Sequence, residues 1–359
     1  MSPLIRAVID TNALRHNLKV IRARAGRAKV MAVIKANAYG HGLVSAALAL
    51  EGADAFAVAR LEEALALRAA GIRAPILLLQ GVFSAAQLAD AAHEGLDLVL
   101  HDAAQIELLE KSAAADRLAV WLKIDSGMHR LGFAPAEFAG MLARIRRLSP
   151  APRELRLLTH LACANERDER ATLAQLQCFR EATRGLDCEV SIANSAGLFG
   201  DVALGWCHWV RPGLALYGVS PFADCTAQQL GLKPVMTLTS AVIAVRRVAR
   251  GESVGYGGAW VAARDSVIAT VAAGYGDGMH RSLESGTPVL VGGQRAPLAG
   301  RVSMDMLAVD VSALDTVQVG APVVLWGEGL PVEEVAHHAG TIPYELLCSV
   351  SQRVPLELR

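Results

Sequence analysis

KVMAVIKA, at residues 29–36, is a short apolar run followed by a turn and an Ala/Leu-rich stretch, and this pattern repeats along the next part of the chain. The Ala/Leu-rich stretches carry apolar residues at helical spacing and often end in Gly. Near-continuous apolar strands are typical of parallel sheets that are buried on both faces. The later runs are AFAVAR (55–60), PILLLQ (75–80), DLVL (97–100), LAVWLKID (118–125), ELRLLTHLA (154–162), EVSIANS (189–195) and HWVR (208–211).

Eight strand–helix units within about 190 residues fit a (β/α)8 barrel better than an open sheet. An open doubly wound sheet stays possible, but no G-x-G-x-x-G follows the first strand to favour it. Residues 4–9 predict a strand before the barrel. The helix that follows this strand is expected to be capped by Asp10 or Thr11.

The sequence pattern changes after about residue 230, where strand-like runs are interrupted by Gly pairs and Pro. This pattern indicates a second, mostly β domain, with a helical turn near 331–340 and another after Pro343. We therefore predict an α/β fold made of a barrel over residues 10–228 and a β-rich C-terminal domain over residues 229–359. The N-terminal strand (1–9) is expected to join the second domain.

The composition favours a protein without nucleic-acid or membrane partners, because 35 Lys and Arg balance 35 Asp and Glu. We find no secretory signal and no apolar stretch long enough to span a bilayer. The six cysteines form no C-x-x-C pair and have no metal-ligand spacing, which favours free thiols in a reducing compartment. The sequence thus predicts a cytoplasmic protein without a metal site.

Two of the six lysines stand where a barrel places its chemistry. Lys35 and Lys123 follow apolar strand residues, and catalytic groups of barrels collect at the carboxyl ends of strands. Burial there lowers the pKa of a lysine and makes its amine a usable nucleophile. Taken alone, a packed lysine stem with a paired ammonium is at least as good an interpretation of either residue.

The loops after the seventh and eighth strands commonly bind phosphate in this fold. Here they carry Asn194 and Ser195, and then Arg211, Gly213 and Leu214. A serine hydroxyl and backbone N–H groups near a glycine can bind an anion. A nucleophilic lysine facing such a site suggests a phosphorylated Schiff-base partner, and the pattern leaves open whether this partner is a cofactor or a sugar phosphate.

Nine motifs in order resemble those of the alanine racemases, a family of pyridoxal-phosphate enzymes with an N-terminal barrel and a C-terminal β domain. The resemblance spans nearly the whole chain, which makes it highly specific. The motifs are AVIKANAYGHG (32–42), LKIDSGMHRLGF (122–133), LLTHLACAN (157–165), NSAG (194–197), VRPGLALYG (210–218), VGYGGAW (254–260), AGYGDGMHR (273–281), GRVSMDMLAVD (300–310) and IPYEL (342–346).

The resemblance implies interconversion of L-alanine and D-alanine through an external aldimine of pyridoxal 5'-phosphate. Lys35 matches the lysine that carries the cofactor and serves as one acid/base, and Tyr256 matches the tyrosine that serves as the other. Racemisation needs one group on each face of the α-carbon. Without the resemblance, Tyr256 would be taken for an ordinary aromatic in a Gly-rich hairpin.

The resemblance also implies a cofactor site. Arg211 matches an arginine facing the pyridine nitrogen, and His160 matches the histidine that supports it. An arginine does not readily give up a proton, so the ring nitrogen is expected to stay unprotonated. The phosphate is expected to be held by residues of three loops and the C-terminal domain, namely Tyr39, Asn194, Ser195, Gly213, Leu214 and Tyr344.

For the substrate, the resemblance points to Arg130 and to the backbone of Met304 as contacts of the alanine carboxylate. Tyr275 and Asp305 match residues of the entrance, and Lys123 matches a lysine that some members carry as a carbamate. The family builds its site between two subunits. We therefore expect a homodimer with shared active sites.

Three rival functions are weighed against this one. The first is a related barrel enzyme. An amino-acid decarboxylase would differ from this chain at the VGYGG motif, whereas a broad-specificity racemase would be exported and would carry disulfides. A non-catalytic cofactor-binding barrel would lack the β domain, and a Schiff-base aldolase would lack the C-terminal motifs. The sequence leaves open whether the role is D-alanine biosynthesis or alanine catabolism.

Overall fold

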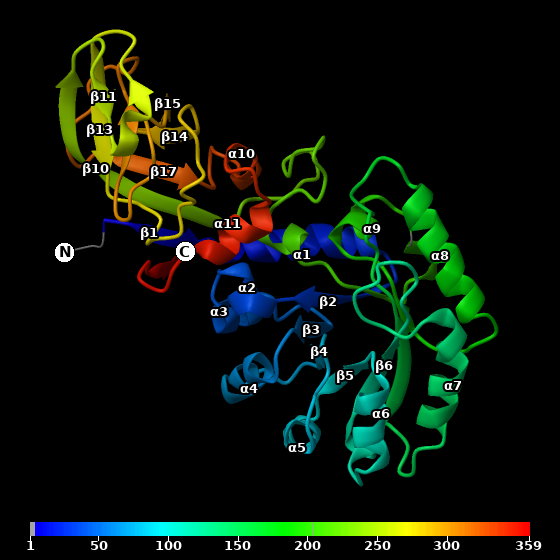
Figure 1. Cartoon of the computed structure of the whole chain (residues 1–359). Coiled ribbons are helices and arrows are strands. Elements are labelled where there is room, and N and C mark those ends of the chain that lie inside the picture. The colour runs from blue at the N-terminus through cyan, green and yellow to red at the C-terminus, as the bar shows by residue number, and fades with distance from the viewer. Residues whose placement is uncertain (1–3, 203) are drawn as a thin grey trace.

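The computed structural model describes residues 4–202 and 204–359, and its first large unit is a closed barrel of parallel strands (Figure 1). The predicted (β/α)8 barrel is confirmed. Its strands pair in sequence order and close through β2 and β9. They are β2 (Lys29–Val33), β3 (Ala55–Val58), β4 (Ile76–Leu78), β5 (Asp97–Leu100), β6 (Ala119–Lys123), β7 (Glu154–Leu158), β8 (Val190–Ser191) and β9 (Trp209–Val210).

All the barrel strands except β5, which matches its predicted run, are shorter than the apolar runs that predicted them. The first run was expected to extend to residue 36, but β2 ends at Val33, and Lys35 begins the short helical segment α2 (Lys35–Tyr39). The last two runs shrink to two-residue strands, β8 and β9. In each case the polar end of the run leaves the strand, so these side chains lie in the loops above it.

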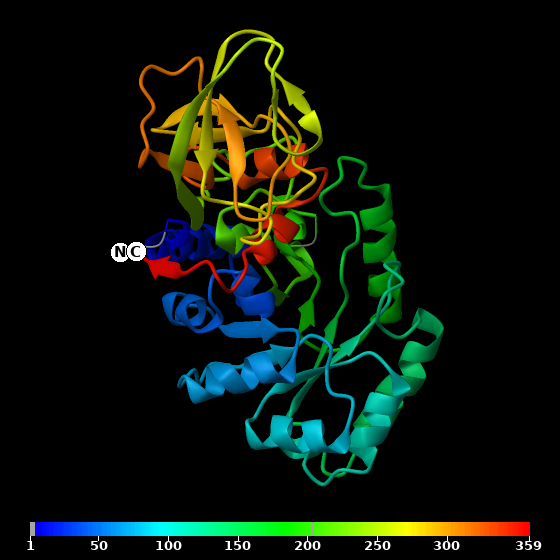
Figure 2. The same cartoon turned by 60° about the vertical axis from the view of Figure 1, so that its left-hand side comes forward.

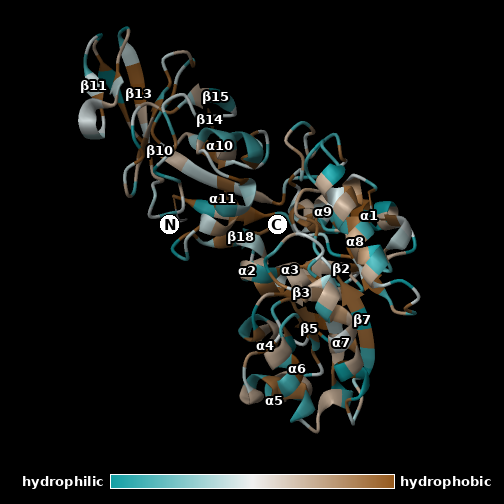
Figure 3. Ribbon diagram, turned by 45° about the vertical axis from the view of Figure 1, so that its right-hand side comes forward, coloured by the Kyte–Doolittle hydropathy of each residue, from teal (hydrophilic) through white to brown (hydrophobic). Residues whose placement is uncertain are grey.

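Helices surround the barrel (Figure 2). The predicted cap of the first helix is confirmed, because the Asp10 side chain accepts from the N–H groups of Asn12 and Ala13. Apolar residues fill the barrel, and brown predominates along strands such as β7 in Figure 3. The helices are α1 (Thr11–Ala25), α3 (Leu43–Ala49), α4 (Leu61–Ala69), α5 (Ala85–His93), α6 (Ala103–Glu110), α7 (Pro135–Arg146), α8 (Arg170–Ala182) and α9 (Ser195–Phe199).

The C-terminal unit is built mainly of antiparallel strands around the long strand β10 (Met236–Val248). The N-terminal strand β1 (Arg6–Ile9) pairs with β10. Residues 1–3 of that predicted strand lie outside the described residues. The other strands are β11 (Ser253–Val254), β12 (Trp260–Val261), β13 (Ser266–Val271), β14 (Pro288–Val291), β15 (Gln294–Pro297), β16 (Leu307–Asp310), β17 (Pro322–Trp326) and β18 (Leu356–Leu358).

Two helices complete this unit, α10 (Val332–His338) and α11 (Pro343–Ser349), where the sequence predicted helical turns. Helix α11 contacts α2 of the barrel, so the two units meet beside Lys35 (Figure 1). The predicted domain boundary between residues 228 and 229 stays a prediction. None of the helices described is long and apolar enough to cross a membrane.

Gly218 fixes the connection between the two units. It ends the short helix η3 (Leu214–Tyr217) with φ +77°, and a Cβ there would overlap the carbonyl oxygen of Lys233. We expect Gly218→Ala to lower the free energy of unfolding by about 4 kcal/mol, because strain and overlap combine. Gly71, at φ +85° with nothing nearby, is the matched control, and Gly71→Ala should cost only about 1–2 kcal/mol. Equal losses in urea unfolding would contradict this account of Gly218.

Candidate active site

Positively charged side chains gather at the end of the barrel that faces the C-terminal unit. Lys35 follows β2, Lys123 ends β6, and Arg211 follows β9. Arg130 lies close enough to lower the pKa of both lysines. The strand ends thus bring four cationic residues from distant parts of the sequence into one site, as expected for a barrel.

Burial lowers the pKa of both lysines. Burial, and then the charge of Arg130, lowers the pKa of Lys35 below its ordinary value. For Lys123, burial and then the charge of Arg211 lower the pKa to about 8. Both amines are therefore more readily available in the neutral, nucleophilic form than an exposed lysine would be.

Arg211 is buried and held by oxygens of the neighbouring strands. One of its N–H groups donates to Ser191 Oγ at 2.6 Å, and another donates to the Thr159 carbonyl at 2.6 Å. Burial lowers its pKa to about 10, so the guanidinium stays charged near neutral pH. Its position is fixed by partners that cannot take its proton.

His160 lies beside this guanidinium, with Nδ1 at 3.3 Å from Arg211 Nη2. Burial and the charge of Arg211 hold the pKa of His160 well below its ordinary value. The imidazole is therefore neutral, and it accepts a hydrogen bond at Nδ1 from the arginine. The structure thus places His160 against Arg211, and the role of this pair at a cofactor stays a prediction.

Backbone N–H groups and hydroxyls form a cradle where β8 and β9 end. Ser195 Oγ accepts from the N–H of Gly213 at 3.1 Å and from the N–H of Ala215 at 3.2 Å. Asn194 caps the helix α9, since its Oδ1 accepts from the Gly197 N–H at 2.9 Å. Helix N-termini and converging N–H groups are favourable for a phosphate.

Two tyrosines complete the cradle. The Tyr39 hydroxyl approaches Gly213 so closely that a Cβ at Gly213 would stand 2.5 Å from it. The Tyr39 ring packs against Tyr217 at 4.7 Å and against Tyr344 of α11 at 5.8 Å, measured between ring centroids. The C-terminal unit thus adds the ring of Tyr344 to the site of its own chain. The backbone N–H groups and the Ser195 and Tyr39 hydroxyls form a donor set that fits a phosphate group.

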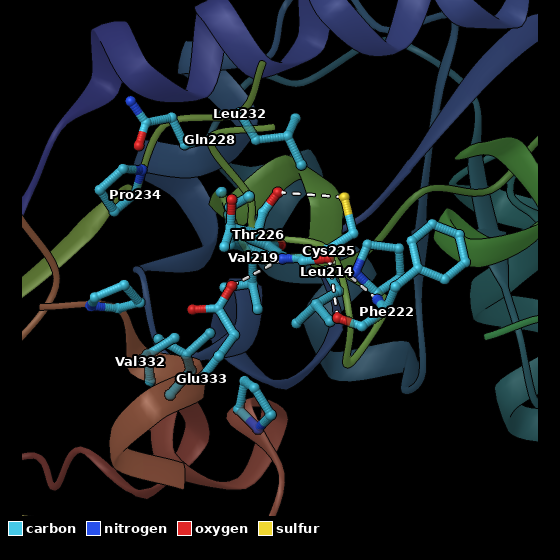
Figure 4. Close-up of a pocket in the computed structure, with 18 of the residues that line it drawn as sticks. Leu214, Val219, Phe222, Cys225, Thr226, Gln228, Leu232, Pro234, Val332 and Glu333 are labelled. Atoms are coloured by element: carbon cyan, nitrogen blue, oxygen red, sulfur yellow. Dashed lines mark hydrogen bonds between the residues drawn. The ribbon is translucent and has the colours of Figure 1, made fainter. Parts of the chain in front are cut away.

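A large cavity reaches the cradle from the side of the C-terminal unit. Its volume is about 1440 Å³, and it is lined mostly by residues 217–234 and by α10. Leu214 and Tyr344 of the cradle also line it, whereas Lys35 does not. Figure 4 shows Glu333 pointing toward Val219 and Thr226, where its carboxylate accepts from the Ser220 N–H at 3.0 Å.

The remaining predicted residues lie elsewhere in the chain. Tyr256 begins a short helical turn directly after β11, and 69% of its surface is exposed. Figures 1 and 3 show β11 at the end of the C-terminal unit that points away from α2. Tyr275 and Met304 are also exposed, and Asp305 pairs with Arg353 at 2.7 Å. Within the described chain, no hydrogen bond or ion pair joins these residues to Lys35 or its cradle.

Comparison with known proteins assigns the chain to a family. The sequence profile described as "Alanine racemase, N-terminal domain" matches residues 9–221, and that of "Alanine racemase, C-terminal domain" matches residues 235–358. The alanine racemase of Vibrio parahaemolyticus is 49% identical over 98% of each chain, and that of Nitrosococcus oceani is 50% identical over 98% of each. The chain belongs to the alanine racemase family.

Solved structures agree with this assignment. The crystal structure of the biosynthetic alanine racemase from Pseudomonas aeruginosa matches with a TM-score of 0.96 at 49% identity, and all of both chains is covered. The alanine racemase of Acinetobacter baumannii matches with a TM-score of 0.94 at 39% identity, again over all of both chains. The resemblance inferred from the motifs is therefore confirmed, and so is the expectation of an enzyme of the isomerase class.

Several residues around this alanine racemase-type site escaped the sequence analysis. The Thr159 carbonyl and the Ser191 hydroxyl fix Arg211, but neither a backbone carbonyl nor a serine in a strand carries a sequence signal of such a role. Glu63 accepts a hydrogen bond from the Ala36 N–H at 2.6 Å. Its place in the first turn of α4 predicts only helix capping. His41 lies within the first motif and is fully buried, so that motif could have directed attention to it.

Gly213 provides a test of the cradle in this family member. In Gly213→Ala the new methyl group should displace the Tyr39 hydroxyl, at a cost of about 1–3 kcal/mol, and weaken pyridoxal-phosphate binding roughly tenfold. Gly140→Ala places its methyl group in open space on α7 and is the control. Equilibrium titration of both variants with the cofactor measures the effect. Unchanged affinity in Gly213→Ala would rule out the cradle as the phosphate site.

Proposed function

We propose that the chain interconverts L-alanine and D-alanine by a two-base racemisation with pyridoxal phosphate. The single observation that carries the proposal is the pairing of the desolvated Lys35 amine with a cationic site and an adjoining phosphate cradle. The alanine racemases that the chain resembles over its whole length support the choice of substrate. A sugar-phosphate aldolase shares the lysine and the cradle but has no use for the C-terminal unit.

The chain's own residues would hold the cofactor at both ends. The cradle of Tyr39, Ser195, Gly213, Leu214 and Tyr344 fits the phosphate, with Asn194 ordering the helix beside it. When bound, pyridoxal phosphate supplies an imine link to the amino acid and the electron withdrawal that makes its α-proton acidic. Lys35, with its lowered pKa, is suited to form that link and then to carry a proton.

Arg211 would set the electronic state of the pyridine ring. Its charged guanidinium is held by Ser191 and Thr159 and donates rather than accepts. A pyridine nitrogen facing it would therefore stay unprotonated and draw less charge into the ring. That restraint favours return of a proton to the α-carbon over transamination.

Tyr256 would come from a second subunit. The tyrosine is exposed and follows β11, which lies away from α2 in Figure 1, so it is not placed to serve Lys35 of the same chain. Racemisation nevertheless needs a second base on the opposite face of the α-carbon. We propose a homodimer in which the partner supplies this tyrosine, together with its entrance residues. The alanine carboxylate would then meet Arg130 of one subunit and the backbone of a Met304 from the other.

Lys123 is proposed to carry a carbamate. The site crowds Lys123 against Arg211 and Arg130, and a carbamate would replace one positive charge with a negative one that can orient Arg130. A pKa of about 8 leaves more neutral amine for carbon dioxide than an ordinary lysine has. The expected cytoplasmic location and the choice between a biosynthetic and a catabolic role stay predictions.

Substitution of the two proposed bases tests the function. We expect Lys35→Ala to abolish racemisation. In Tyr256→Phe, racemisation should fall at least about 100-fold, since a positioned acid or base contributes 10²–10⁴-fold, but Lys35 should still exchange the α-proton of one enantiomer with solvent. Chiral chromatography measures racemisation, and NMR in deuterium oxide measures exchange.

The matched control is Tyr217→Phe, which removes a buried hydroxyl that donates to the Val33 carbonyl at 3.0 Å. Its thermal unfolding reports the cost of losing a tyrosine hydroxyl from the fold. If Tyr256→Phe exchanged the α-protons of both enantiomers as fast as the unaltered protein, the two-base proposal would be wrong.

The carbamate predicts a spectroscopic signal. Protein equilibrated with ¹³C-bicarbonate should show a carbamate resonance that grows as the pH rises from 6 toward about 8, because only the neutral amine of Lys123 reacts. Lys123→Gln should lack it, whereas Lys111→Gln, altered at a lysine remote from the site, should keep it. A density map with a bare ammonium at Lys123 would count against the carbamate.

A further inference from the structure

The segment that follows Lys35 has an unusual backbone. Ala36, Asn37, Ala38 and Tyr39 are all left-handed, with φ between 52° and 53°. Each such residue other than glycine costs about 1–2 kcal/mol, and only Asn tolerates the conformation easily. This strained turn joins the candidate nucleophile to the phosphate-binding tyrosine, so contacts must hold it in place.

The end of the turn away from Lys35 is held by His41. Its ring is fully buried, stacks on Tyr217 at 4.5 Å, and donates from Nδ1 to the carbonyls of Ala38 and Tyr39 at 3.0 and 2.9 Å. Burial lowers the pKa of His41 to about 4, so the ring is neutral and Nδ1 carries its proton. These contacts fix Tyr39 but do not reach Lys35.

The end of the turn beside Lys35 is held from another strand–helix unit. Glu63 of α4 accepts from the Ala36 N–H through one carboxylate oxygen at 2.6 Å. Its other oxygen accepts from the N–H groups of Ala59 and Arg60 at 2.9 and 3.1 Å. The carboxylate therefore ties the residue after Lys35 to the start of α4, and its two oxygens have separate partners.

Glu63 also acts on Lys35 through its charge. Burial and the charge of Arg130 push the pKa of the lysine down, and the charges of Cys348 and then of Glu63 oppose them. The same side chain thus sets both the backbone position next to the lysine and part of the field at its amine. If Glu63 only capped α4, the hydrogen bonds from the N–H groups of Ala59 and Arg60 would be sufficient, and the one from Ala36 would serve no purpose.

We propose that Glu63 is a positioning residue that fixes the left-handed turn and thereby aims the Lys35 amine at the cofactor carbonyl. The proposal rests on the proposed function, because it presumes that Lys35 forms an imine with pyridoxal phosphate. Glu63 itself touches neither cofactor nor substrate in this account. It acts through the backbone N–H of Ala36.

The test measures how readily Lys35 reacts. Protein stripped of cofactor is titrated with pyridoxal phosphate, reduced with borohydride, and digested, and mass spectrometry gives the fraction of the Lys35 peptide that is modified. Glutamine has only one side-chain oxygen, so in Glu63→Gln the amide N–H₂ must face a backbone N–H, either that of Ala36 or those of Ala59 and Arg60. The substitution also removes the negative charge that strengthens the hydrogen bond from Ala36. We expect half-modification to need about 10- to 100-fold more pyridoxal phosphate.

Glu62→Gln is the matched control, since Glu62 is the exposed neighbour on the same helix. It should behave as the unaltered protein does. Thermal unfolding of both variants checks that they fold. The proposal is overturned if Glu63→Gln and Glu62→Gln reach half-modification at the same cofactor concentration.

Glu63→Asp separates geometry from charge. It keeps the carboxylate but withdraws it by one methylene from Ala36, so it should also need more cofactor. Because loss of a negative charge lowers the pKa of a nearby lysine, the pH midpoint of the modification rate should move down in Glu63→Gln but not in Glu63→Asp. Equal midpoints in the two variants would overturn the electrostatic part.

Failure of the proposed function would look different. In that case the unaltered protein itself would leave Lys35 unmodified by pyridoxal phosphate or would not racemise alanine. Failure of the Glu63 proposal would leave an active, Lys35-modified protein whose reactivity does not depend on Glu63.

Discussion

Mutual repulsion among buried cations is the constraint on which the site depends. Lys35, Lys123 and Arg211 meet at one end of the barrel, where burial raises the cost of each charge, and the exposed Arg130 adds a further positive charge beside the two lysines. The pKa values of Lys35 and Lys123 are lowered, so these two lysines lose their protons more easily. Arg211 keeps its charge, because it donates buried hydrogen bonds. An anionic ligand, with a phosphate at one end and a carboxylate at the other, would reduce the repulsion that remains among the positive charges.

The two structural units share the work unequally. The barrel supplies the amine, the guanidinium and most of the cradle, while α11 brings Tyr344 to the same chain's site. Tyr256 is exposed and follows β11, which lies at the end of the C-terminal unit away from α2 (Figure 1). This separation gives a physical reason for a second subunit, because a lone chain would hold a base on one face of the α-carbon only.

The barrel and the grouping of its polar strand ends could be predicted from the sequence, because parallel strands in order bring their carboxyl ends together. The left-handed turn after Lys35 could not be predicted, because a run of Ala, Asn, Ala and Tyr gives no sequence signal of positive φ angles. Glu63 was missed for a related reason: its hydrogen bond to Ala36 spans two strand–helix units, and local sequence patterns carry no information about such contacts.

Mixing subunits tests the shared site most directly. Lys35→Ala and Tyr256→Phe proteins, each inactive alone, are combined, dissociated and reassociated, and racemisation is measured. A mixed dimer with shared sites contains one site with both bases intact, so random mixing should restore about a quarter of the unaltered activity. If no activity returned although mixed dimers had formed, the two bases would not meet across an interface, and the account would be contradicted.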